Sequence, residues 1–163
     1  MKFILTKELG RLVRWLRILG FDCAYFTSEN KSSLVITALR EDRIIITRNH
    51  NLTKSAGINV VVLESELIKD QMKELMAKLN FKPDKELLFS RCIICNESLQ
   101  SVEKSFVAGK VPEYVFKTEE SFVSCPICKR IYWQGTHWGN VAEILKEVSL
   151  LSLQSRCAIE SKI

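Results

Sequence analysis

The sequence lacks any long hydrophobic run. No stretch of apolar residues approaches the ~18 that a membrane-spanning helix requires. The apolar stretch near the first residue is also interrupted by charge within a few positions, which is too short for a secretory signal. Hydrophobic residues nevertheless make up 47% of the 163 residues and charged residues 26%, as in folded globular proteins rather than disordered ones. We therefore expect a cytoplasmic protein without membrane contact, large enough for one domain and a smaller appendage.

The chain also lacks a strong excess of either charge. Its formal net charge is +5, and most of this excess lies in the first half. Residues 1–80 contain 13 Lys and Arg against 9 Asp and Glu, whereas residues 81–163 contain 11 against 10. A modest basic excess confined to one part of a chain indicates an anionic partner such as nucleic acid.

The first half alternates apolar runs with helical patterns. Four apolar runs predict strands, at residues 1–5, 23–26, 43–47 and 59–63. Three periodic segments predict helices, at about residues 7–19, 32–41 and 65–79, with Ser32 or Ser33 capping the second. Strands that alternate with helices predict an α/β domain over residues 1–85, with a mainly parallel sheet flanked by helices. Beyond this boundary the sequence is turn-rich and contains cysteine.

Four cysteines in the second half form two pairs with the same spacing. Cys92 and Cys95 lie in RCIICNES, and Cys125 and Cys128 lie in SCPICKR. Two residues between cysteines allow both thiolates of a tight turn to reach one ion, and two such turns complete the tetrahedral set of structural zinc. Disulfides or a redox-active pair are the alternatives, but neither suits a cytoplasmic chain with two separate pairs. We therefore predict a small zinc ribbon that holds a structural Zn²⁺.

The predicted ribbon covers residues 86–148 with a closing helix, and residues 149–163 form a tail. Cys23 and Cys157 lack partners at metal-binding spacing and are expected to be ordinary thiols. We expect the two parts to fold separately, so that removal of the metal would unfold the residues beyond about 90 and leave much of the first domain folded.

The segment KELGRLVRWLRILG predicts an amphipathic helix with a basic face. Its leucines and valine share one side at helical spacing, Lys7, Arg11 and Arg14 lie on the other side, and Arg17 lies toward its flank. The simpler interpretation is a solvated charged face. The alternative is an RNA-binding surface, because arginine can bind phosphate oxygens through two hydrogen bonds, and only Glu8 opposes these four cations.

Several segments together carry a resemblance to a known family: MKFILTKELGRLVRWLRILGFD, RIIITRNHNL, LFSRCIICN, VPEYVF and CPICKRIYWQGTHW. In this order they resemble the Mut-seven C-terminal RNase family, which joins a PIN-like α/β nuclease domain to a C-terminal zinc ribbon. The resemblance implies RNA as the substrate class and a divalent metal, Mg²⁺ or Mn²⁺, as the cofactor of hydrolysis. It also implies the four paired cysteines as zinc ligands.

The sequence departs from this family at the positions where metal-binding aspartates are expected. Thr6 stands at the end of the first strand, and Asn49 follows Thr47 and Arg48 where the family has aspartate. Loss of these two charges is expected to weaken the binding of Mg²⁺ or Mn²⁺, which prefer charged oxygens. It also makes a groove that contains Arg48 more attractive to phosphates.

Other acidic positions of the family are matched unevenly. One falls near Ser32 and Ser33, where Glu29 is the nearest carboxylate, and another is matched by Glu66 or Glu64. Asp22 matches the family as well. Asp22 and Glu66 are therefore the candidate catalytic residues.

Three functions follow from these residues. The leading hypothesis is an RNA-binding protein of a ribonuclease family with a degenerate metal site, which binds RNA or a ribonucleoprotein. The second is an active metal-dependent endoribonuclease that uses a shifted set of residues, namely Asp22, Glu29, Glu66 and His50. The third is a protein-interaction module that docks through the ribbon. His137 and Trp138 are expected to anchor the ribbon against the first domain or to contact RNA.

Overall fold

A parallel four-stranded sheet forms the centre of the first domain. The structure is a computed structural model that describes residues 1–52, 58–133 and 146–147. The sheet has the order β2-β1-β3-β4, with every neighbouring pair parallel. Its strands are β1 (Lys2–Thr6), β2 (Asp22–Phe26), β3 (Ile44–Thr47) and β4 (Val60–Val62). The predicted α/β class with a parallel sheet is therefore confirmed.

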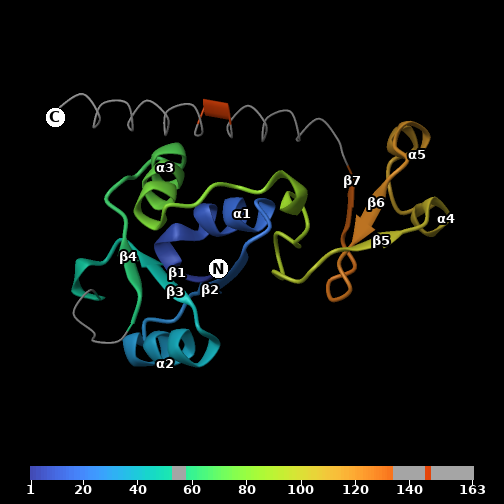
Figure 1. The fold of residues 1–163 in the computed structure, drawn as a ribbon. Coiled ribbons are helices and arrows are strands. Elements are labelled where there is room, and N and C mark those ends of the chain that lie inside the picture. Colours follow the sequence, from blue (N-terminus) through green and yellow to red (C-terminus); the bar gives the residue numbers. More distant parts are fainter. Residues whose placement is uncertain (53–57, 134–145, 148–163) are drawn as a thin grey trace.

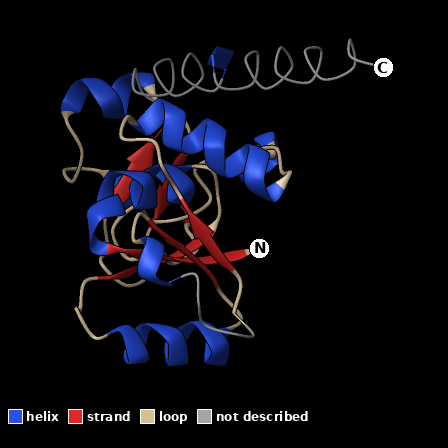
Figure 2. Ribbon diagram, turned by 90° about the vertical axis from the view of Figure 1, so that its left-hand side faces the viewer, coloured by secondary structure: helices blue, strands red, loops and turns tan. Residues whose placement is uncertain are grey.

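Helices cover both faces of this sheet. Helices α1 (Gly10–Ile18) and α3 (Ile68–Leu79) lie on one face, and α2 (Lys31–Glu41) lies on the other (Figures 1 and 2). The alternation of β1 explains both layers, because Phe3 and Leu5 pack with α1 and α3 whereas Ile4 packs with α2. The inner strands β1 and β3 are consequently apolar on both faces, as expected for a parallel sheet.

Short 3₁₀ helices and local hydrogen bonds set the ends of these elements. The 3₁₀ segments are η1 (Lys7–Leu9), η2 (His50–Leu52) and η3 (Lys85–Leu87). The side chain of Asn30 accepts a hydrogen bond of 3.0 Å from the N–H of Ser33, so Asn30 caps α2. The prediction that Ser32 or Ser33 caps this helix is therefore wrong.

The second part of the chain contains a small antiparallel sheet of order β5-β6-β7. Its strands are β5 (Gln100–Val102), β6 (Phe122–Ser124) and β7 (Ile131–Trp133), and the excursion between β5 and β6 carries α4 (Lys104–Val107) and α5 (Glu113–Thr118). Val107, Val115 and Phe122 form a separate buried cluster there.

Several expectations lie outside the described residues. They concern most of the closing helix up to residue 148, the tail at 149–163, and the residues His137, Trp138 and Cys157. Within the described ranges, no helix is both long and apolar enough to cross a membrane.

The loop between β4 and α3 is held by one carboxylate. Glu74 accepts hydrogen bonds from the N–H groups of Glu64 (3.0 Å) and Ser65 (3.0 Å), and its carboxylate lies 2.7 Å from Nζ of Lys78. Burial tends to raise the pKa of Glu74, but these donors outweigh burial and lower the pKa to about 2. Helix α3 therefore begins at Ile68 rather than at the predicted Ser65, because the preceding residues are held in an extended loop.

We expect Glu74→Gln to lower the free energy of unfolding at pH 7 by about 1–3 kcal/mol. The folded pKa of about 2 lies below the ordinary glutamate pKa of 4.5, so the stabilisation is present above pH 4.5 and is lost as the pH falls toward 2. Urea denaturation should therefore show the difference between wild type and variant narrowing below that pH.

A matched control is Glu113→Gln, which removes an exposed i,i+4 ion pair with Lys117 and should change stability by no more than about 0.5 kcal/mol. A stability difference for Glu74→Gln that stays constant between pH 7 and pH 3 would contradict this account.

Candidate functional site

Thr6 and Asn49, the uncharged residues at the positions where aspartate was expected, both lie at the carboxyl edge of the parallel sheet. Strands β1 and β3 are adjacent and parallel, so both end at this edge. Thr6 and Asn49 line one cleft there, with a volume of about 290 Å³. Oγ1 of the buried Thr47 lies 3.0 Å from Oγ1 of Thr6 and accepts a hydrogen bond of 3.0 Å from the N–H of Asn49. The fold thus connects the two positions through one threonine.

A carboxylate that sequence reasoning did not single out reaches the same edge. Oε1 of Glu8 lies 2.5 Å from Oγ1 of Thr6, 3.1 Å from Oγ1 of Thr47 and 3.0 Å from the N–H of Arg48. The 3₁₀ turn η1 lies between the end of β1 and the start of α1, so Glu8 stands just beyond the carboxyl end of the strand. The available signal was its position three residues beyond the end of the predicted strand at residues 1–5.

The hydrogen bonds to Glu8 hold it in its charged form. Burial tends to raise the pKa of this carboxyl, but the N–H of Arg48 and the hydroxyls of Thr6 and Thr47 outweigh burial and leave the pKa below its ordinary value. The carboxylate is thus stabilised by protein donors at the carboxyl edge of the sheet, beside Thr6.

The other carboxylates near the cleft each have a basic neighbour. Glu66 is 3.0 Å from Arg48, Glu64 is 3.3 Å from Nε2 of His50, and Glu29 is paired with Lys7. All three carboxylates are exposed. The edge therefore holds alternating charges rather than a group of unpaired acids.

Asp22 does not share this edge. It begins β2 and is in register with Lys2, at the amino end of the sheet. Its Oδ1 lies 2.6 Å from Nη1 of Arg43 and accepts a hydrogen bond of 2.7 Å from Nδ2 of Asn96. Burial tends to raise the pKa of Asp22, but these two partners lower it below its ordinary value. The expectation that Asp22 and Glu66 belong to one catalytic site does not hold, because parallel strands place their first and last residues at opposite edges.

The basic face of α1 is only partly as predicted. Arg11 and Arg14 are exposed, and neither side chain makes an ion pair or hydrogen bond with another described residue. Lys7 is exposed as well. Arg17, in contrast, is only 7% exposed, and its guanidinium donates to backbone carbonyls. Its predicted place on the RNA-facing surface is therefore wrong, because another part of the chain packs on the last turn of α1.

The four paired cysteines converge on one point. Their sulfur atoms all lie within 4.8 Å of one another, and Sγ of Cys92 is 3.6 Å from Sγ of Cys128. Four thiolates around a tetrahedral zinc, each at ~2.3 Å, would lie ~3.8 Å apart. The cysteines in the described ranges are free thiols. The donor set and its spacing therefore fit a metal ion.

Both cysteine turns have the same backbone. The N–H of Asn96 donates to the carbonyl of Cys92 (2.9 Å), and the N–H of Lys129 donates to the carbonyl of Cys125 (3.0 Å). Asn96 and Lys129 each adopt a positive φ, of 68° and 60°. The repeated geometry brings two sulfurs of each turn to the same side.

Hydrogen bonds also favour the thiolate of Cys92, which is the form that binds metal. Burial tends to raise the pKa of Cys92, but the N–H groups of Cys95 and Ile94 and the hydroxyl of Tyr132 lower it to about 6. The hydroxyl of Tyr132 lies 3.1 Å from the sulfur. Tyr132 thus contacts the candidate metal centre.

Comparison with known proteins agrees with the resemblance seen in the sequence. Residues 1–145 match the family model described as Mut7-C RNAse domain. Comparisons with curated proteins and with solved structures give no match. The matched residues include the parallel sheet, the cleft at its carboxyl edge and all four converging cysteines. The chain therefore belongs to the Mut7-C RNAse domain family.

Proposed function

We propose that the protein binds RNA at the carboxyl edge of its parallel sheet and no longer has a divalent-metal site able to cleave it. Membership of a ribonuclease family supports RNA as the partner. The observation that carries the proposal is the hydrogen bonding of Glu8 by Thr6, Thr47 and the N–H of Arg48. These donors occupy the carboxylate oxygen that faces the end of β1.

The charges of the side chains at the carboxyl edge support the absence of a Mg²⁺ or Mn²⁺ site there. Mg²⁺ and Mn²⁺ in nucleases neutralise the scissile phosphate and are themselves held by charged oxygens. Thr6 and Asn49 offer only neutral oxygens. A cation that bound at Glu8 would have to compete with three hydrogen bonds for the same oxygen, and Glu66 is already paired with Arg48. Such a site would bind a divalent ion weakly.

The shifted active site is less well supported. It would require Asp22 to act with Glu29, Glu66 and His50. Asp22 and Thr6 lie at opposite ends of the paired strands β2 and β1, four residues apart in register. At ~3.3 Å per residue this separates the two edges by roughly 13 Å. A carboxylate at that distance cannot share a metal ion with Glu66.

The surface of α1 is suited to phosphate. Arg11 and Arg14 have no described partners that would compete with a ligand. Arg11 also lines a second cavity, of about 470 Å³, which shares Glu8 with the first cleft. Lys7, Lys31 and Arg48 line the first cleft itself. An RNA backbone that crosses this region would meet basic side chains on both sides of Glu8.

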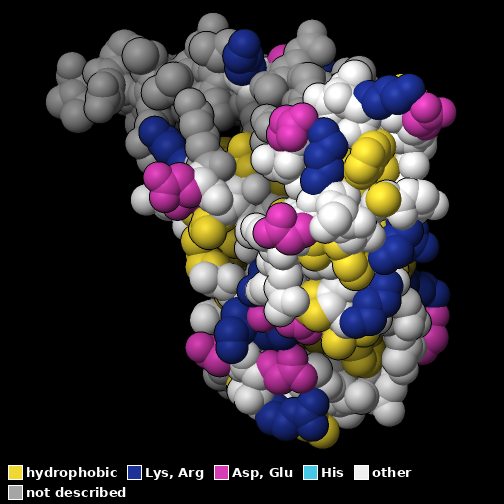
Figure 3. Space-filling view, turned by 90° about the vertical axis from the view of Figure 1, so that its right-hand side faces the viewer, with side chains coloured by type: hydrophobic (Ala, Val, Ile, Leu, Met, Phe, Trp, Pro, Cys, Tyr) yellow, Lys and Arg dark blue, Asp and Glu magenta, His cyan; other side chains and the backbone are white. Residues whose placement is uncertain are grey.

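The ribbon side of the molecule is less suited to phosphate. Figure 3 views the molecule from the side of the three-stranded sheet, where Lys and Arg are interleaved with acidic and apolar side chains. The ion pairs Lys104–Glu120 and Lys117–Glu113 are examples from this part of the chain. Surfaces of mixed charge give little net attraction for a polyanion.

Protein docking through the ribbon is the second candidate function, and one observation favours it. Ile94 and Ile127 occupy equivalent positions in the two cysteine turns and are 45% and 66% exposed. A protein partner would cover apolar side chains of this kind, and its binding would depend weakly on salt.

RNA binding tests the proposed function directly. Arg11→Gln with Arg14→Gln is expected to weaken binding to unrelated single-stranded RNAs about equally and to reduce the salt slope by about 2, one for each lost phosphate contact. Fluorescence anisotropy over a series of salt concentrations measures both quantities. The matched control is Arg40→Gln with Lys117→Gln, which removes the same charge from other exposed positions.

Equal affinities and slopes in wild type and the Arg11/Arg14 variant would overturn the assignment of this surface. Equal losses of RNA affinity in both double variants would show that binding depends only on the net charge of the protein, which would also overturn the assignment.

We propose further that the metal at the four cysteines is zinc. Elemental analysis of protein purified under reducing conditions should then find about one zinc per chain. Cys128→Ser should lose the zinc, whereas Cys23→Ala should retain it because Cys23 is buried in the core of the first domain. Zinc retained by Cys128→Ser, or absent from wild type, would contradict this assignment.

A further inference from the structure

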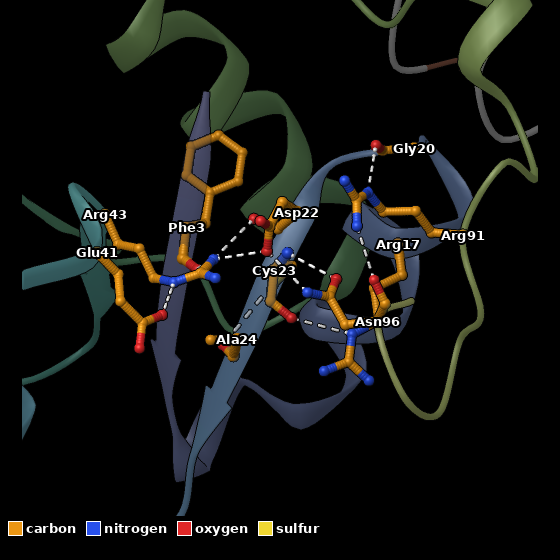
Figure 4. Close-up of polar contacts among 10 residues, drawn as sticks. All are labelled: Phe3, Arg17, Gly20, Asp22, Cys23, Ala24, Glu41, Arg43, Arg91 and Asn96. Atoms are coloured by element: carbon orange, nitrogen blue, oxygen red, sulfur yellow. Dashed lines mark hydrogen bonds and ion pairs between the residues drawn. The ribbon is translucent and has the colours of Figure 1, made fainter. Parts of the chain in front are cut away.

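A buried arginine joins the first cysteine turn to the parallel sheet. Arg17 Nε donates to the carbonyl of Cys23 in β2 (3.0 Å), and its Nη1 donates to the carbonyls of Ile93 (2.9 Å) and Ile94 (2.7 Å). The side chain comes from the last turn of α1 and lies beside β2 (Figure 4). A buried guanidinium is costly unless its donors are satisfied, so these carbonyls must stay in place for Arg17 to stay buried.

Asn96 makes the same connection from the opposite direction. Its Oδ1 accepts a hydrogen bond of 2.8 Å from the N–H of Cys23, and its Nδ2 donates to Asp22 (2.7 Å) (Figure 4). Strand β2 is an edge strand of its sheet, and the N–H of Cys23 would otherwise lack a partner on its open side. One residue therefore completes the cysteine turn and also closes the edge of the sheet.

The chain that enters the turn is held against α1 as well. Arg91 donates to the carbonyls of Gly20 (3.2 Å) and Asn96 (2.7 Å), and the N–H of Phe89 donates to the carbonyl of Ile18 (2.7 Å). A Cβ at Gly20 would lie 2.3 Å from the carbonyl oxygen of Leu87, so only glycine permits this close approach.

The orientation of the turn links these bonds to the cysteine sulfurs. The N–H of Cys95 points inward, 3.3 Å from Sγ of Cys92, while the preceding carbonyls of Ile93 and Ile94 face Arg17. A metal that draws the sulfurs together fixes this orientation, because the turn cannot rotate without moving a ligand. Without the metal, the turn is free to open and the acceptors of Arg17 are no longer held.

We propose that metal binding at the four cysteines stabilises the amino end of β2 and the last turn of α1, through a polar latch formed by Arg17, Asp22, Arg91 and Asn96. The metal then supports the sheet that carries the cleft as well as the ribbon itself. This differs from the expectation, drawn from the sequence, that the two parts respond separately to removal of the metal.

Amide hydrogen exchange at Cys23 reports on the latch. In protein loaded with Zn²⁺ and measured by NMR, removal of the metal with a chelator should accelerate exchange at this amide by about tenfold or more. The amides of Ile45 and Ile46 in β3 lie away from the latch and should change much less. Adding Zn²⁺ back should restore the slow exchange.

Two glycine variants separate the latch from the fold of the turn. Asn96→Gly keeps a residue that readily adopts a positive φ but removes the side-chain bonds to β2, so Cys23 should exchange about tenfold faster even with zinc bound. Lys129→Gly is the matched control at the equivalent position of the second turn, where the side chain donates a hydrogen bond to the carbonyl of Pro126 and makes no hydrogen bond to β2 among the described residues. In zinc-loaded Lys129→Gly, the amide of Cys23 should exchange at the wild-type rate.

Equal exchange at Cys23 in the two zinc-loaded variants would overturn the proposal, and so would an effect of chelation confined to residues beyond about 90. If chelation unfolds the whole chain, the proposal is decided by whether the amide of Cys23 exchanges faster in zinc-loaded Asn96→Gly than in zinc-loaded Lys129→Gly. The proposal does not depend on RNA binding, so its failure would leave the proposed function standing.

Discussion

The pairing of β1 with a parallel strand on each side is the constraint on which the rest of the structure depends. It places every strand end of the first domain at one edge and every strand beginning at the other. At the carboxyl edge, Thr6, Asn49 and Glu8 line the cleft. At the amino edge, Asp22 meets Asn96 of the first cysteine turn. The sheet thus separates a candidate RNA site from a candidate metal-supported joint.

Neutral side chains at the carboxyl edge change what this edge can bind. Aspartates at Thr6 and Asn49 would repel one another and require a cation. The present side chains instead contact groups within the protein: Oγ1 of Thr6 lies beside Glu8 and Thr47, and Oδ1 of Asn49 accepts a hydrogen bond from the N–H of Asn51. Glu8 supplies one negative charge, which is balanced by donors from Arg48 and two threonines. Arg11 and Arg14 of α1 make no ion pair with a described acid, as the proposed contact with phosphates requires.

Local patterns predicted much of this structure. The apolar runs predicted the strands, the cysteine spacing predicted the converging sulfurs, and the parallel topology accounts for Thr6 and Asn49 lining one cleft. The failures at Glu8 and Arg17 depend on contacts between residues far apart in the sequence. Glu8 acquires its role from the N–H of Arg48, 40 positions away, and Arg17 becomes buried because Ile93 and Ile94 lie over its helix, 76 and 77 positions away. Helical periodicity cannot indicate such a neighbour.

Incubation of wild-type protein with Mn²⁺ and end-labelled single-stranded RNA, with the protein in excess so that all the RNA is bound, tests the central claim most directly. The account predicts that the RNA stays intact and that adding Mn²⁺ makes no difference, since two of the expected metal ligands are neutral and Glu8 is bound by protein donors. Mn²⁺-dependent cleavage by wild type that disappears in Glu8→Gln would contradict it, because that result would show Glu8 holding a catalytic metal.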